Sequence, residues 1–139
     1  MTQPGFDSLC DRLLAIAGRE VKPAPGGEDN AIDALLKDGR SLRLGIDLCR
    51  MQPGHCNVNM ARLWRQHSGN LAAICTGYAL DTDGTVWRQH WWGISNGERI
   101  VETTVPRSRY FGIDFTGDGA DKIAADILRR FQSNEDPKL

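Results

Sequence analysis

The sequence lacks several features that would place the chain in a specialised class. Its 139 residues contain no apolar run approaching the roughly 20 residues of a membrane span, and its start lacks a basic segment followed by an apolar one. The formal net charge is −1, which provides no field for attracting nucleic acid or an anionic membrane. We therefore expect a cytoplasmic chain with no nucleic-acid partner and no membrane partner.

The four cysteines also lack the spacing of a disulfide or metal framework. None forms a C-x-x-C pair, and Cys10 and Cys75 fall within apolar patterns, which favours reduced thiols. A zinc site is an alternative, but its candidate ligands do not have the short paired spacing of structural zinc sites. Those ligands would be Cys49, His55, Cys56, His67 and Cys75. We expect no metal and no other cofactor.

Length and composition are those of one globular domain with a modest core. Hydrophobic residues make up 40% and charged residues 25%, and no repeat is evident, so nothing indicates a second domain. We expect a single domain over residues 1–139, with a core from about residue 6 to 131 and a polar, frayed tail over 132–139.

Apolar periodicity predicts helices near both ends of the chain. The first is expected over residues 6–17, followed by a proline- and glycine-rich loop over 22–27. A second short helix should run to Lys37, capped by Asp29 or Asn30. At the other end Asp118 is expected to cap a helix with a regular apolar stripe, at Ala120, Ile123, Ala124, Ile127, Leu128 and Phe131.

Strand signals dominate the middle of the chain. They predict a short strand over 42–46, then an antiparallel meander of 71–80, 85–94 and 99–105, with 106–115 returning as an irregular or edge segment. The expected fold is α+β, with N-terminal helices, including one that carries Cys56, packed on an antiparallel sheet, and a C-terminal helix.

Cys56 is predicted to open its helix. Pro53-Gly54 favours a turn before it, and positions 56, 60, 63, 64 and 67 repeat along one helical face. Unpaired backbone N–H groups and the macrodipole at a helix start favour negative charge and so lower a thiol pKa. The alternative is a small buried apolar residue, which describes most cysteines.

A thiol nucleophile needs a base, and the base needs a third group that holds its tautomer. His55 is adjacent to Cys56 but points in another direction, so it is expected at the rim. His67 lies three turns along the helix, about 16 Å away at the helical rise per residue. His90 stands in the centre of an aromatic strand, where a polar side chain needs a partner.

The partner of His90 depends on the turn that follows its strand. If Ser95-Asn96-Gly97 is a three-residue loop with Gly97 left-handed, His90 lies directly opposite Glu102. If Asn96-Gly97 is a two-residue turn, His90 and Glu102 lie on opposite faces of the sheet. Asn-Gly alone favours the second arrangement. We predict the first because it gives the histidine a carboxylate.

A cysteine on a helix, a histidine on a strand and an acid on the next strand resemble the papain-like and transglutaminase-like cysteine superfamily. The resemblance covers about residues 50–112. It rests on Cys56-Asn57-Val58-Asn59, on His90-Trp91-Trp92-Gly93, similar to a His-Ala-Trp type segment, and on Ile100-Val101-Glu102-Thr103-Thr104, similar to a Val-Asp-Pro-Thr type segment. Here Glu102 replaces the usual aspartate, and Thr103 stands where proline is common.

The resemblance implies a thiol hydrolase, peptidase or acyl transferase with a Cys56–His90–Glu102 triad, acting on a peptide, a protein or a small amide. One alternative is a non-catalytic binding module for a peptide or small ligand on the same scaffold, which the small size of the chain supports. Another is a subunit that needs a partner to complete its site. The sequence does not indicate an oligomeric state.

Four further residues are candidates around this triad. The side chain of Gln52 or Asn59 could assist the backbone N–H of Cys56 in binding an oxyanion, with turn and cap roles as the alternatives. Trp92 and Arg88 share the strand face of His90 and are candidate substrate-binding residues. Core packing for the tryptophan and a solvated charge for the arginine are the alternatives.

Overall fold

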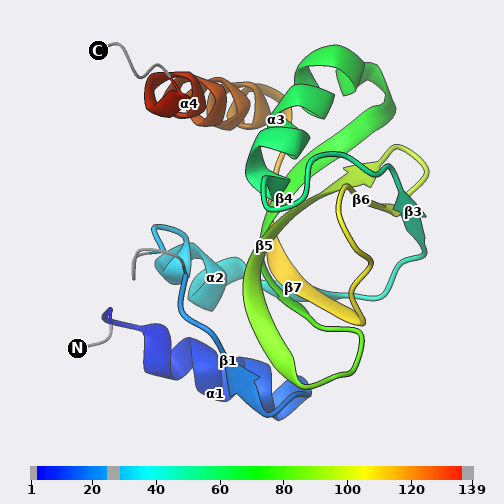
Figure 1. The fold of residues 1–139 in the computed structure, drawn as a ribbon. Coiled ribbons are helices and arrows are strands. Elements are labelled where there is room, and N and C mark those ends of the chain that lie inside the picture. Colours follow the sequence, from blue (N-terminus) through cyan, green and yellow to red (C-terminus); the bar gives the residue numbers. More distant parts are fainter. Residues whose placement is uncertain (1–2, 25–28, 136–139) are drawn as a thin grey trace. The chain divides into compact units, whose positions relative to one another are not determined.

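The computed structural model describes residues 3–24 and 29–135, which form four α-helices and seven strands (Figure 1). The helices are α1 (Phe6–Ile16), α2 (Ile32–Asp38), α3 (Cys56–His67) and α4 (Gly117–Glu135), with a 3-10 turn, η2 (Ser68–Asn70), after α3. The strands are β1 (Glu20–Val21), β2 (Arg40–Leu42), β3 (Ile46–Leu48), β4 (Leu71–Leu80), β5 (Val86–Ser95), β6 (Ile100–Glu102) and β7 (Arg109–Phe115). They form an open mixed sheet in the order β2-β7-β4-β5-β6-β3, and β1 pairs with β5. The predicted α+β class is confirmed.

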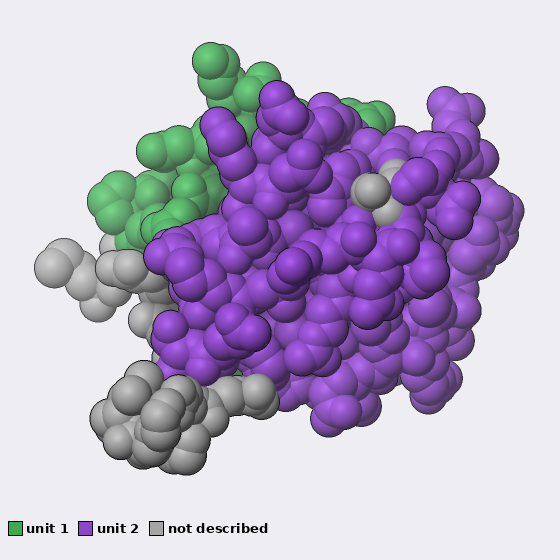
Figure 2. All heavy atoms as spheres, turned by 90° about the horizontal axis from the view of Figure 1, so that it is seen from above, with its two compact units in different colours: residues 1–43, 76–90, 106–113 green, residues 44–75, 91–105, 114–139 purple. Residues whose placement is uncertain are grey.

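The chain divides into two compact units, coloured separately in Figure 2. Unit 1 comprises residues 1–43, 76–90 and 106–113, and unit 2 comprises residues 44–75, 91–105 and 114–139. Strands β4, β5 and β7 each contribute residues to both. The expectation of a single domain stays a prediction, and each unit is described by itself.

The core of unit 1 forms where α1 and α2 bury their apolar stripes. Its buried members are Phe6, Leu9, Leu13, Ile32, Leu35, Tyr78, Leu80, Trp87 and Phe111. Arg12 of α1 caps the end of α2, since its guanidinium donates to the carbonyl oxygens of Leu36 (2.7 Å) and Gly39 (3.1 Å). Those carbonyls have no partner within the helix, so the cation satisfies them and complements the helix dipole.

The core of unit 2 forms where α3 and α4 lie side by side (Figure 1). Its buried members are Val58, Met60, Ala61, Trp64, Leu71, Ile74, Ala120, Ala124 and Ile127, which confirms the predicted stripe of the last helix as core. Helix α4 begins at Gly117, with Asp118 in its first turn, and continues to Glu135. The expected tail is therefore helical over residues 132–135, and the rest of it, 136–139, lies outside the described residues.

Most predicted elements occur, with shifted ends. Helix α2 begins at Ile32 with Ala31 as its cap residue, and Asp29, two residues before that cap, accepts a hydrogen bond from the backbone N of Ala31 (2.9 Å). The predicted strand over 42–46 is two strands, β2 and β3. Of the predicted loop over 22–27, residues 22–24 have no regular structure and the remainder lies outside the described residues.

Two expectations about the sheet are wrong. The sheet is mixed and not antiparallel throughout, because β1 pairs in parallel with β5 and β3 in parallel with β6. The segment predicted as irregular or as an edge contains β7, an interior strand between β2 and β4. Side-chain alternation sets which face a residue occupies but carries no information on strand direction or neighbours across long connections.

The β5–β6 hairpin has a three-residue loop, as predicted, but the loop lies one residue later. The backbone N of Ser95 donates to the carbonyl of Arg99 and the N of Glu98 donates to the carbonyl of Ser95, each over 2.9 Å. The loop is therefore Asn96-Gly97-Glu98. Glu98, not Gly97, occupies the left-handed position, with φ 59°.

This loop changes the register of the two strands. Gly93 pairs with Val101, and continuing the ladder by one residue places Trp92, not His90, opposite Glu102. The prediction that His90 lies directly opposite Glu102 is wrong. A shift of two residues leaves every side chain on its original face, so the error does not exclude an interaction between the two side chains, which stays a prediction.

Candidate functional site

Helix α3 begins at Cys56, as the sequence predicts. Its first turn is closed by the backbone N of Asn59, which donates to the carbonyl of His55 over 2.8 Å. The Cys56 side chain is half-buried, while Met60 and Trp64 on the predicted inward face are buried. A half-buried thiol at a helix start lies where the macrodipole favours the thiolate.

The chain that leads to Cys56 is hydrogen-bonded along the end of β6. The backbone N of Cys49 donates to the carbonyl of Glu102, and the N of Met51 donates to the carbonyl of Thr103, each over 2.7 Å. These bonds continue the parallel β3–β6 ladder beyond β3. The structure therefore brings residues 49–51, the approach to Cys56, alongside Glu102 within unit 2.

The Asn59 side chain adds a third tie between the same two segments. Its Nδ2 donates to the carbonyl of Gln52 over 2.9 Å and to Oγ1 of Thr103 over 3.1 Å. An amide nitrogen carries two hydrogens, so none is left for an oxyanion and the positioning role remains for Asn59. The Gln52 residue is exposed, and its role as an oxyanion donor stays a prediction.

Glu102 is buried to the extent that none of its surface is exposed. Its Oε2 accepts hydrogen bonds from the backbone N of Thr104 (3.0 Å) and from its hydroxyl (3.1 Å). Burying a carboxylate costs several kcal/mol unless hydrogen bonds or charges compensate it. Sequence reasoning did not assign Thr103 or Thr104 to the site, although two short hydroxyl residues directly after an acid favour such local bonds.

His90 belongs to unit 1, where it is 3% exposed. Its carbonyl accepts a hydrogen bond from the hydroxyl of Thr76 (3.1 Å), and its ring centroid lies 6.4 Å from that of Tyr110. The contact of the His90 ring with Cys56 or Glu102 stays a prediction.

The two candidate substrate-binding residues have different surroundings. Trp92 is fully buried in unit 2, which favours shielding over direct substrate contact. Arg88 is exposed in unit 1 and lies 3.6 Å from the carboxylate of Asp81, an exposed pairing worth about 0–1 kcal/mol. Their roles in substrate binding stay predictions.

The other histidines lie on or beside α3. The His55 ring meets Phe131 edge to face, with centroids 5.5 Å apart, and His67 is exposed in the last turn of the helix. Within residues 3–24 and 29–135, no group of three or more His, Cys, Asp or Glu side chains could hold a metal ion, so the zinc alternative gains no support.

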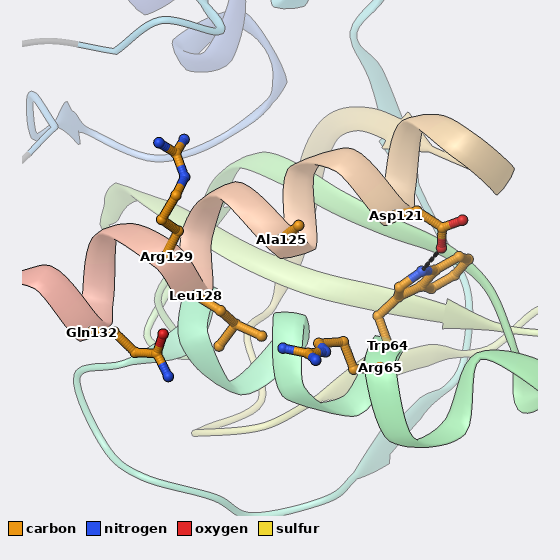
Figure 3. Close-up of a pocket in the computed structure, with 7 residues that line it drawn as sticks. All are labelled: Trp64, Arg65, Asp121, Ala125, Leu128, Arg129 and Gln132. Atoms are coloured by element: carbon orange, nitrogen blue, oxygen red, sulfur yellow. Dashed lines mark hydrogen bonds between the residues drawn. The ribbon is translucent and has the colours of Figure 1, made fainter.

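A pocket of about 480 Å³ lies between α3 and α4 in unit 2 (Figure 3). One end is closed by the indole of Trp64, which donates to Oδ1 of Asp121 over 2.7 Å. The other lining residues are Arg65, Ala125, Leu128, Arg129 and Gln132. The residues described as lining this pocket do not include Cys56, His90 or Glu102.

None of the helices in the described part of the chain is long and apolar enough to cross a membrane. The sequence matches no protein-family model, and no curated protein or solved structure matches it.

Proposed function

We propose that this chain is a cysteine-dependent amide-bond hydrolase or acyl transferase with a papain-like or transglutaminase-like fold. The observation that carries the proposal is the approach to Cys56, which is hydrogen-bonded along the strand end that carries the fully buried Glu102. A thiol at a helix start and a buried carboxylate on the strand end that pairs with the preceding chain are two of the three groups that nucleophilic cysteine catalysis needs. His90, the buried histidine of the strand that pairs with β6, is proposed as the third.

In the proposed reaction, the Cys56 thiolate attacks the acyl carbon and the Cys56 backbone N–H binds the resulting oxyanion. The His90 imidazolium donates its proton to the leaving amine as the C–N bond breaks, which leaves a thioester on Cys56. Neutral His90 then removes a proton from water or from a second amine. That nucleophile breaks the thioester and returns the thiolate, while Glu102 orients the ring throughout.

Hydrolysis and acyl transfer differ only in the nucleophile that reaches the thioester, so one site serves both. The proposed substrates are peptides, proteins or small amides. The competing proposal of a non-catalytic binding module requires no reactive thiol, and the reactivity of Cys56 therefore separates the two.

The test is the pH dependence of alkylation by iodoacetamide, followed at each cysteine by mass spectrometry. We expect rapid labelling of Cys56 near pH 6, lost in both His90→Ala and His90→Gln, with thermal melts verifying that the variants fold. Labelling of Cys56 with the profile of a free thiol, whose pKa is about 8.5, would overturn the proposal and favour the binding module.

The chain provides its own reference thiol. Burial, with the negative charges of Asp7 and Asp11, raises the pKa of the Cys10 thiol. Cys10 should therefore label slowly across the same pH range in every variant, while the exposed Cys49 reports on reagent quality.

A further inference from the structure

We infer that Asn59 and Thr103 form a clamp that positions Cys56 and thereby sets its reactivity. The inference rests on the proposed function, because it concerns the thiolate that the proposed reaction uses. Asn59 and Thr103 are 1% and 0% exposed, so neither side chain reaches a substrate from the surface, and both act through Cys56 as positioning residues.

The clamp acts where the backbone ladder stops. The last ladder bond before α3 is from the N of Met51 to the carbonyl of Thr103. Between Met51 and Cys56, two hydrogen bonds converge on the Gln52 carbonyl: one from the Asn59 amide and a longer one, 3.4 Å, from the N of His55. The Asn59 side chain therefore ties the first turn of α3 to the loop that precedes it.

The second arm of the clamp fixes that turn against β6. Asn59 lies three residues after Cys56, so its side chain leaves the same helical turn as the thiol. Its bond to Oγ1 of Thr103 spans 44 positions of sequence and reaches the residue directly after Glu102. One amide thus links the thiol-bearing turn to the segment that carries the carboxylate.

An asparagine at position 59 costs folding free energy, and packing alone does not explain why the chain has one there. Within the described residues, Oδ1 of Asn59 is buried without a hydrogen-bond partner, and such an acceptor costs about 1–3 kcal/mol. An apolar residue would fill the space without that cost. The two hydrogen bonds of Nδ2 are what asparagine adds, and both hold the Cys56 turn in place.

The test compares two substitutions at Thr103 by the alkylation profile of Cys56. Thr103→Val keeps the shape and removes the hydroxyl acceptor, whereas Thr103→Ser keeps the hydroxyl. We expect Thr103→Val to lower the labelling rate of Cys56 at pH 6 by about tenfold, the effect of one pKa unit, and Thr103→Ser to preserve it within about twofold. Asn59→Ala should behave as Thr103→Val does, and provides a second removal of the clamp if either variant fails to fold.

Trp64→Phe provides the matched control for stability. It removes the hydrogen bond to Asp121 two turns along the same helix and should lower the melting temperature without changing the Cys56 profile. If Thr103→Val and Asn59→Ala also lower only the melting temperature, the clamp is structural and the inference is overturned. If wild-type Cys56 itself labels as a free thiol, the proposed function has failed, and the inference fails with it.

Discussion

The hydroxyl of Tyr78 donates a hydrogen bond to Oδ2 of Asp29 over 2.9 Å inside the core of unit 1. The other oxygen of the same carboxylate accepts from the backbone N of Ala31, so one side chain connects β4 to the start of α2. Burial of Tyr78, and next the negative charge of Asp29, raise the pKa of the phenol well above its ordinary value.

This relationship predicts an alkaline loss of stability. Above pH 10, the ordinary pKa, an unfolded Tyr78 ionises while the folded one keeps its proton, so stability is full below that pH and falls as pH rises further. Tyr78→Phe should cost about 1–3 kcal/mol at neutral pH, because Asp29 loses a donor. The difference in unfolding free energy between the two proteins, measured by urea unfolding, should be constant below about pH 9 and should narrow as the pH rises above about 10. A gap independent of pH would contradict the prediction.

Glu102→Gln should slow alkylation of Cys56 near pH 6 by about tenfold, since a neutral amide does not stabilise an imidazolium. Asp47→Asn is the matched control: it makes the same charge change in unit 2, where Asp47 pairs at the surface with Arg99 over 2.8 Å. It should leave the Cys56 profile unaltered. Unchanged Cys56 reactivity in Glu102→Gln would remove the glutamate from the proposed mechanism.

Glu98→Gly should stabilise the protein by up to about 1 kcal/mol, because Glu98 has a left-handed backbone that glycine adopts without strain. Gly97→Ala is the complementary change. Gly97 does not have a positive φ, and an added Cβ would meet only the Ser95 hydroxyl at 3.7 Å, so alanine should be tolerated or slightly stabilising. Thermal melts measure both. If Glu98→Gly destabilised the protein and Gly97→Ala did so too, the left-handed residue would be Gly97, as in the loop Ser95-Asn96-Gly97 that the sequence predicted.

Gly77→Ala should destabilise the protein by more than about 3 kcal/mol. A Cβ on Gly77 would overlap the carbonyl oxygen of Phe111 and lie 2.6 Å from the Cα of Gly112, both backbone atoms that cannot move aside. Gly119→Ala in α4 is the control, because nothing lies within 4 Å of its added Cβ and alanine favours a helix by about 1 kcal/mol. A soluble, cooperatively melting Gly77→Ala protein would refute the close approach of β4 and β7.

Long periodic patterns predicted their elements to within one or two residues, as at α1 and β4, because burial of one face constrains many residues at once. The hairpin loop could not be placed in this way. Asn96 donates from its backbone N to the carbonyl of Asn70 (3.1 Å) and from Nδ2 to that of Gly69 (2.6 Å). These acceptors lie far from the hairpin in sequence, so Asn-Gly turn preferences alone do not carry the information.

In the candidate site, too, the sequence predicts the features that depend on neighbouring residues and misses those that depend on distant ones. The start of α3 at Cys56 follows from local turn chemistry, and the sequence predicts it correctly. The hydrogen-bond acceptor of the Asn59 amide on Thr103 could not be predicted from local sequence. Thr103 lies 44 positions away, and its segment is placed by the parallel β3–β6 pairing. A hydroxyl in a short strand end looks the same in sequence whether it faces water or receives a buried amide.

The interleaving of the two units has a consequence for how the chain is synthesised. The chain enters each unit three times, so no contiguous fragment consists of one unit alone. Unit 2 takes α4 from the last segment, residues 114–139, and its core side chains on α3 have no α4 to cover them until that segment leaves the ribosome. Domains usually fold from the N-terminus as they emerge. Here the core face of the helix that carries Cys56 stays uncovered by α4 until residues 114–139 have been synthesised.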